Sequence, residues 1–168
     1  MKVALVGHTG QIGMEISSIL GNDKIKGYSR STGWDVSNVA QHQSMIDDMD
    51  DCDVFIDASS ARWENTKLLI KLYQNWKDIN GKQIIVIGSD AADYDDQTIE
   101  GIQYAAVKAA HKKASRIIQY NNSECELKYV SFGYIDTDDI RAKYPNLVST
   151  FIPVEEAGKI ICSLISNT

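Results

Sequence analysis

The sequence predicts an α/β fold, in which a single, doubly wound parallel sheet is covered on both faces by helices in a three-layer α/β/α arrangement. Short apolar runs, typical of buried strands, alternate along the chain with longer amphipathic stretches that are typical of helices. A glycine-rich segment, VGHTGQIG, belongs to the first apolar run and opens the first helical stretch. Since the chain has 168 residues and no internal repeat or low-complexity linker, we expect one domain, residues 1–168.

The expected elements follow one another as strand and helix in alternation. We expect strands at residues 2–7, 24–29, 53–58, 83–89 and 127–132, and helices near 11–20, 37–49, 63–77, 102–119 and 154–166. Pro153 and the acidic pair Glu155 and Glu156 are typical of the first turn of the last helix. This alternation implies right-handed crossovers and parallel strands, and in such sheets a ligand binds outside the carboxyl ends of the strands.

Composition excludes several classes of function. The chain is 43% hydrophobic and 24% charged, with a formal net charge of −6, which gives no field suited to nucleic acid phosphates. The apolar run after Met1 is too short for a signal peptide or a membrane span, so we expect a cytoplasmic protein without a membrane partner. The three cysteines and three histidines do not cluster, and we expect neither a disulfide framework nor a metal site.

Three glycines, Gly7, Gly10 and Gly13, lie between the first strand and the first helix. In this setting backbone amides and a helix N-terminus can hold a pyrophosphate, as in Rossmann-like domains. Gly7 permits the tight turn, Gly10 lets the backbone approach the phosphates, and Gly13 allows close packing of the helix. The alternative is a tight turn that binds nothing.

The end of the second strand indicates which dinucleotide is bound. An acidic residue there favours NAD, whereas an arginine accommodates the 2′-phosphate of NADP. The sequence reads GYSRSTG, so that Arg30 and Ser31 supply donors and no carboxylate. This favours NADP, with a solvated loop arginine as the alternative.

Tyr104 and Lys108 are four residues apart in QYAAVKAAHKK and share one face of the expected helix. A nearby ammonium favours the phenolate and lowers the pKa of a tyrosine, which makes it a better acid at neutral pH. The spacing also occurs by chance in soluble helices, where both residues are simply part of the surface.

Together these motifs resemble the short-chain dehydrogenase/reductase family over nearly the whole chain. GHTGQIG, including Thr9, Gln11 and Ile12, is similar to the family's cofactor turn, and Asp35-Val36 to its adenine-flanking pair. Ser89 lies where the catalytic serine ends the strand before the tyrosine helix. FGYIDT resembles the segment against the nicotinamide, which the resemblance extends to Gly133, Ile135 and Thr137.

The chain also departs from the family's pattern. Phe132 replaces a proline, and DASS, residues 57–60, replaces Asn-Ala-Gly, so that only Ala58 carries over as a cofactor residue. The segment between Arg30 and Asp35 leaves no room for a helix, and we expect at most a short strand around Trp34. VEEAGKIICSLIS resembles the family's penultimate helix, and no further strand follows it.

The resemblance implies that Ser89 binds the substrate oxygen, Tyr104 donates a proton, and Lys108 holds the nicotinamide ribose as well as tuning Tyr104. Asn65 is the best candidate for the asparagine that supports a proton-relaying water. We therefore expect an NADPH-dependent oxidoreductase that acts on a small carbonyl compound or the corresponding alcohol. The alternative is a non-catalytic dinucleotide-binding sensor or scaffold, which commonly loses the tyrosine.

Further expectations concern groups outside this set. His8 and His111 are expected to be solvated or capping residues, and the acidic loop 89–100 a solvated or mobile flap rather than a metal site. By the resemblance, the helices at 63–77 and 102–119 pair across subunits in a homodimer or homotetramer. The apolar residues expected at that interface are Leu68, Leu69, Leu72, Ala106 and Ala110.

Overall fold

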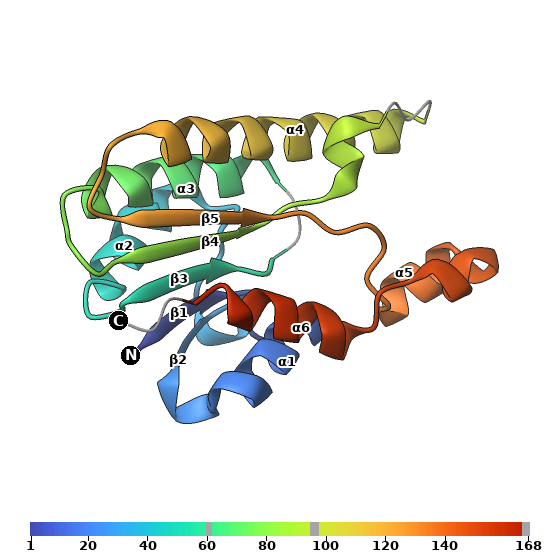
Figure 1. Cartoon of the computed structure of the whole chain (residues 1–168), viewed down its shortest axis with the longest axis horizontal. Helices are drawn as coiled ribbons and strands as arrows, with labels where there is room; N and C mark the ends of the chain where they lie inside the picture. The colour runs from blue at the N-terminus through green and yellow to red at the C-terminus, as the bar shows by residue number, and fades with distance from the viewer. Residues whose placement is uncertain (60–61, 95–97, 166–168) are drawn as a thin grey trace.

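A computed structural model describes residues 1–59, 62–94 and 98–165, and they form one parallel sheet in the strand order β2-β1-β3-β4-β5 (Figure 1). The strands are β1 (Val3–Val6), β2 (Ile25–Tyr28), β3 (Val54–Asp57), β4 (Gln83–Ile87) and β5 (Glu126–Val130). The expected parallel α/β fold is confirmed, and each strand lies within two residues of its predicted bounds.

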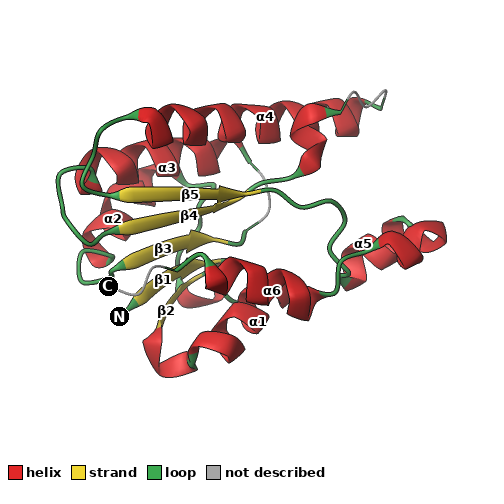
Figure 2. Ribbon diagram, viewed as in Figure 1, coloured by secondary structure: helices red, strands yellow, loops and turns green. Residues whose placement is uncertain are grey.

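Helices cover both faces of the sheet (Figure 2). They are α1 (Gln11–Leu20), α2 (His42–Asp48), α3 (Trp63–Trp76), α4 (Ile99–Tyr120), α5 (Asp138–Lys143) and α6 (Val154–Ser163). One buried cluster joins the sheet to α2, α3 and α4, and includes Met45, Leu69, Trp76 and Ile118. A second cluster lies between the sheet and α1 with α6, around Ile16, Ala157 and Ile161.

Burial changes the expectation for subunit pairing. Leu68, Leu69 and Leu72 are at most 1% exposed and pack in the core under α3, so they cannot contact a second chain. Their spacing of one, three and four residues is that of a helix stripe facing its own sheet. Among the residues expected at an interface, Ala106 on α4 is exposed.

The structure differs from the sequence prediction in several segments. The helix expected near 37–49 is a 3₁₀ helix, Val39–Gln41, followed by α2, which begins at His42. Helix α4 begins at Ile99, three residues early, because the side chain of Thr98 accepts a hydrogen bond from the amide of Gly101 at 3.0 Å. After β2, where a loop with at most a short strand was expected, the chain forms a short 3₁₀ helix, Arg30–Thr32, and Trp34 packs against Tyr28. Helix α5 and the 3₁₀ helix Pro145–Thr150 were not predicted.

Helix α5 lies beyond the carboxyl ends of the strands, to which the start of α4 also extends (Figure 1). Among the described residues, every helix is too short or too polar to cross a bilayer. The carboxyl edge of the sheet is thus framed by the glycine-rich turn, the start of α4 and the α5 segment.

Candidate active site

The glycine-rich turn after β1 is packed so closely that two of its glycines cannot carry a side chain. Gly7 has φ +77°, and a Cβ added there would lie 2.8 Å from the amide nitrogen of Ser59. A Cβ on Gly13 would lie 2.3 Å from the carbonyl oxygen of Gly7 and 2.7 Å from the Cα of His8. The start of α1 is therefore pressed directly against the turn.

The turn offers the groups that a pyrophosphate needs. Gly10 is the N-cap of the ten-residue helix α1 and no side chain caps its amides, so backbone N–H groups and the positive end of the helix dipole remain available. A Cβ on Gly10 would meet only the Gly7 carbonyl oxygen, at 3.4 Å, and Thr9 is exposed. These residues fit a dinucleotide at this edge of the sheet.

The next two residues of the predicted cofactor turn have other contacts. Ile12 packs against the apolar cluster between the sheet and α1. The side chain of Gln11 exchanges two hydrogen bonds with Asp138, donating from Nε2 at 3.1 Å and accepting from the Asp138 amide at 2.8 Å. Gln11 thus connects the glycine-rich turn to the first residue of α5.

Arg30 and Ser31 lie in the 3₁₀ helix that follows β2, where both are exposed, and the Ser31 hydroxyl is 2.7 Å from that of Ser29. Nearby, Asp35 accepts hydrogen bonds from the amide and hydroxyl of Ser37, which lower the pKa of its carboxyl group. The charges of Arg30 and Arg62 lower it further. Val36 packs against the core beneath this group.

Arg62 was missed by the sequence analysis. It immediately precedes α3, more than thirty residues after Arg30, and nothing in its local sequence predicts that it comes near Asp35. The charges of two arginines therefore act on the carboxylate at the expected adenosine end of the site.

Tyr104 and Lys108 do share one face of α4. The Lys108 ammonium lies 5.8 Å from the centre of the Tyr104 ring, and it points to the carbonyl oxygen of Ile87 at the end of β4, 3.5 Å away. Tyr104 is 44% exposed. Burial lowers the pKa of Lys108, and the charge of Asp57 opposes this effect.

Ser89 lies two residues beyond Ile87, where it caps a short 3₁₀ helix, Asp90–Asp93, and its hydroxyl accepts from the Ala91 amide at 3.3 Å. The end of β4 thus carries both Ser89 and the carbonyl group next to Lys108. The acidic loop expected at 89–100 is structured at its start, while residues 95–97 lie outside the described part of the chain.

The segment after β5 holds the three further residues that the resemblance assigned to the cofactor, and two of them also have structural contacts. Gly133 is exposed, and a Cβ there would meet only the Asp90 carboxylate, at 3.7 Å. Ile135 is 8% exposed and forms an isolated β-bridge with Ile152, while the Thr137 hydroxyl accepts from the Ile140 amide as the N-cap of α5. Side chains at 135 and 137 are therefore already used in packing and capping.

Asn65 is 3% exposed, and its amide group is fully engaged. Its Nδ2 donates to the Asp57 carboxylate at 2.6 Å and lies 2.7 Å from the Ser59 hydroxyl, while its Oδ1 accepts from the Arg62 amide at 3.2 Å. Ala58, between these residues, lies directly against Gly7. The departure DASS therefore replaces an asparagine by a buried carboxylate, which the sequence analysis did not assign.

The expectation for His111 is wrong. This side chain is 7% exposed, and its Nε2 is buried without a hydrogen-bond partner, because α4 turns it towards the sheet. His8 is half-buried with its ring against Gly27, where a Cβ would lie 2.5 Å away, and its Nδ1 has no partner either.

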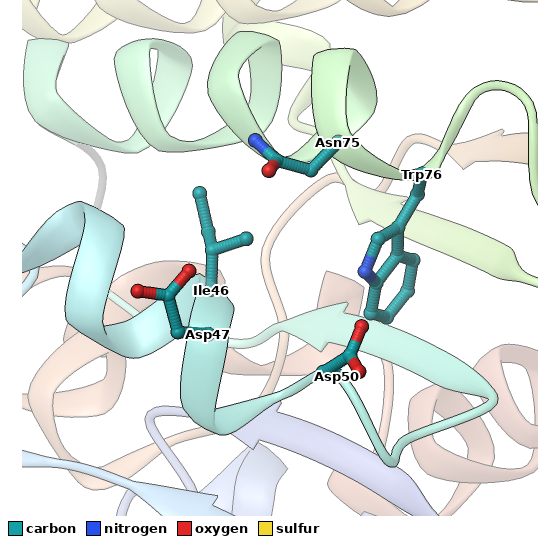
Figure 3. A pocket seen from close by; sticks show the side chains of 5 residues that line it. All are labelled: Ile46, Asp47, Asp50, Asn75 and Trp76. Carbon is teal, nitrogen blue, oxygen red and sulfur yellow. The ribbon is translucent and has the colours of Figure 1, made fainter.

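Two surface hollows lie at the opposite, amino edge of the sheet. One, of about 250 Å³, is lined by Ile46, Asp47, Asp50, Asn75 and Trp76 at the ends of α2 and α3 (Figure 3). The other, of about 180 Å³, is bordered by Met1, Asp53 and the turn around Gly81. Neither contains a residue of the predicted site. Nor does any group of three histidine, cysteine or acidic residues among the described residues suit a metal ion.

Several solved structures align with this chain over nearly its whole length. A short-chain dehydrogenase from Burkholderia cenocepacia J2315 in complex with NADP aligns over all of this chain and 87% of its own, with 16% identity and a TM-score of 0.75. A small-chain dehydrogenase in complex with NADPH aligns over 99% and 91%, with 17% identity and a TM-score of 0.79. The chain has the fold of short-chain dehydrogenases/reductases.

A third structure with this fold is the 3-alpha-hydroxysteroid dehydrogenase from Pseudomonas sp. B-0831 complexed with NADH. It aligns over 99% of this chain and 90% of its own, with 15% identity and a TM-score of 0.75. No family model and no curated protein sequence matches the chain. At these identities the comparisons establish the dehydrogenase/reductase fold, and the chemistry must be argued from the residues.

Proposed function

We propose that the protein is an NADP-dependent oxidoreductase that reduces a small carbonyl compound or oxidises the corresponding alcohol. The observation that carries this proposal is the position of Lys108, whose ammonium lies between the Tyr104 ring and the Ile87 carbonyl group at the carboxyl end of β4. A phenol beside a partly buried ammonium, at the edge of the sheet where ligands bind, is suited to proton transfer.

Three residues of the chain would each have a separate role in the reaction. Tyr104 is exposed enough to reach a substrate, and it would donate its proton to the carbonyl oxygen. Lys108 would favour the phenolate that remains and hold the hydroxyls of the nicotinamide ribose. Ser89, beyond the end of β4, would donate a hydrogen bond to the same carbonyl oxygen. Bound NADPH would supply the hydride.

The cofactor preference rests on the end of β2. Arg30 is exposed there, and Arg62 brings a second positive charge to the same carboxylate, Asp35. Arginine is suited to binding phosphate because its N–H donors form a planar fork. The Asp35 carboxylate already accepts a hydrogen bond from the Ser37 hydroxyl. Structures with this fold have been solved with NADP, NADPH and NADH, so the preference for NADPH is our proposal for this chain.

We also propose that the protein forms a homodimer or homotetramer. With Leu68, Leu69 and Leu72 buried, an interface on α3 and α4 would use exposed side chains such as Ile70 and Ile102. A two-fold arrangement would bury both copies of these residues together.

Substitution of Tyr104 by phenylalanine tests the catalytic proposal. The change removes the proton donor and keeps the ring, so NADPH affinity should stay within a factor of a few while carbonyl reduction falls by about 10²- to 10⁴-fold. NADPH oxidation with a panel of aldehydes, ketones and quinones measures the rate, and fluorescence titration measures the affinity.

Two results would count against this assignment. If Tyr104→Phe retains the wild-type rate, the tyrosine is an ordinary surface residue. If the wild type binds NADPH but turns over no carbonyl compound in the panel, the protein is the sensor or scaffold that the sequence left as the alternative.

A further inference from the structure

A buried carboxylate lies at the centre of the sheet's carboxyl edge. Asp57 is the last residue of β3, between β1 and β4, and is 7% exposed. One oxygen accepts from the amide and hydroxyl of Ser59, at 3.0 and 2.6 Å, and the other from Asn65 at 2.6 Å. These three donors hold the carboxylate in one orientation.

The charge of the carboxylate acts on two groups of α4, the partly buried Lys108 and the buried His111. In the sheet Asp57 pairs with Val86, and the next residue, Ile87, provides the carbonyl oxygen to which Lys108 points. His111, one turn further along α4, is buried with a free Nε2. Lys108 and Asp57 do not form a direct ion pair, and the carboxylate acts on the ammonium through its charge.

We propose that Asp57 is the counter-ion of Lys108, a positioning residue that keeps the lysine charged and directed at the mouth of the sheet, and that Asn65 and Ser59 serve to hold this carboxylate. The role of Lys108 in catalysis rests on the proposed function, whereas the pairing of the two charges does not. Asn65 then acts through Asp57 instead of through a water molecule.

The physical reason is the cost of burying an ammonium. Removal from water disfavours the charged form of lysine, and a neutral Lys108 would neither favour the Tyr104 phenolate nor hold ribose hydroxyls firmly. The carboxylate counteracts that loss. Asp57 is the charged group that acts on Lys108, and Asp57 and Lys108 are the charged groups that act on His111.

The pKa of His111 depends on the charges of both Asp57 and Lys108, so it can be used to detect them. Burial and the charge of Lys108 lower its pKa, and the charge of Asp57 opposes them. Removing the carboxylate should therefore lower the pKa of His111 further, and removing the ammonium should raise it. The chain has three histidines, so their imidazole signals can be assigned by single substitutions.

The decisive experiment is an NMR titration of the His111 imidazole in the protein without cofactor. We expect Asp57→Asn to lower the pKa of His111 by about 0.5 pH units or more, since a nearby opposite charge shifts a pKa by roughly 1 to 3 units. Lys108→Met should raise it. Ser59→Ala, the matched control, removes the two hydrogen bonds of the Ser59 hydroxyl, with Asp57 and Asn65, but no charge, and should leave the pKa of His111 unchanged.

An unchanged His111 pKa in Asp57→Asn would overturn the proposal. Should that variant fail to fold, Lys108→Met decides alone, because it leaves Asp57 and its three donors intact, and an unchanged or lower His111 pKa would then exclude the pairing. These titrations require no turnover, so their failure is distinct from failure of the proposed oxidoreductase activity.

A kinetic readout separates positioning from simple structural support. In Asp57→Asn the pKa of Lys108 falls further, so the lysine loses its proton at lower pH, and the alkaline limb of the kcat/KM profile should move to lower pH. Ser59→Ala should lower the rate without moving that limb. If the alkaline limb of the kcat/KM profile lies at the same pH in Asp57→Asn as in the wild type, this would contradict the role of Asp57 in catalysis.

Discussion

The two edges of the sheet differ in whether their polar side chains have hydrogen-bond or ion-pair partners. At the amino edge, charged side chains are paired: Lys26 lies 3.1 Å from Asp48 and 3.3 Å from Asp51, and Lys82 donates to the carbonyl oxygens of Asp50 and Cys52. At the carboxyl edge, His8 Nδ1, Thr66 Oγ1 and His111 Nε2 are buried without partners, next to a lysine that burial makes less basic.

We interpret this difference as support for the proposed site at the carboxyl edge. Buried polar groups in folded proteins are nearly always hydrogen-bonded, so a concentration of unpaired groups costs stability and persists where function requires it. The amino edge has two surface hollows and the paired Lys26 and Lys82, and the carboxyl edge has the glycine-rich turn, Tyr104 and Lys108.

The largest difference between the edges should come from glycine substitutions. A Cβ at Gly13 would collide with the backbone of Gly7 and His8, so Gly13→Ala should cost about 1 to 3 kcal/mol of stability and weaken NADPH on the order of 100-fold. Gly81, at the amino edge, has φ +82° but open space around it. Gly81→Ala should destabilise through backbone strain and leave NADPH affinity unchanged. Equal affinity losses would contradict the comparison.

A smaller and more selective effect is expected at the adenosine end. A charged hydrogen bond contributes roughly 1.5 to 3 kcal/mol, so Arg30→Ala should weaken NADPH binding by about ten- to a hundredfold. NADH affinity should hardly change, because NADH lacks the 2′-phosphate. Calorimetric titration with both cofactors measures this, and equal losses would show that Arg30 does not contact the phosphate.

The smallest expected effect concerns the amino edge and depends on pH. Hydrogen bonding and charge from Lys2 and Lys26 lower the pKa of Asp51 from 3.8 to about 2. Because the folded-state pKa is depressed, this stabilisation is complete above about pH 4 and is lost as the pH falls through 2. In Asp51→Asn, the free energy of unfolding, measured with urea, should fall less between pH 4 and pH 2 than it does in the wild type. NADPH binding at neutral pH should match the wild type.

Much of the fold follows from local sequence. The runs around Val3 to Val6 and Gln83 to Ile87 are buried strands because nearly every residue in them is apolar, and VGHTGQIG forms the turn because only glycine fits at positions 7 and 13. Helix α5 was missed because DDIRAK is short and polar, and its only strong signal is the capping Thr137.

The candidate site was predictable where spacing decides the geometry and not where tertiary contacts do. Tyr104 and Lys108 share a face because they lie four residues apart on one helix. The burial of His111 and the approach of Asp57 to α4 depend on how α4 packs against the sheet, which one strand's sequence does not encode. DASS was interpreted only as a departure, although a carboxylate at the end of a buried strand, with an asparagine eight residues later, was a usable signal.

The central claim is that a nicotinamide dinucleotide binds at the carboxyl edge of the sheet. A titration of the ¹⁵N-labelled protein with NADPH, followed through its assigned backbone amide signals, tests this most directly. We predict that the amides of Gly7, Gly10 and Gly13 shift together with those around Arg30, and that those of Asp47, Asp50 and Asn75 do not. Shifts centred on the hollow at the amino edge, or none at all at saturating NADPH, would contradict the account.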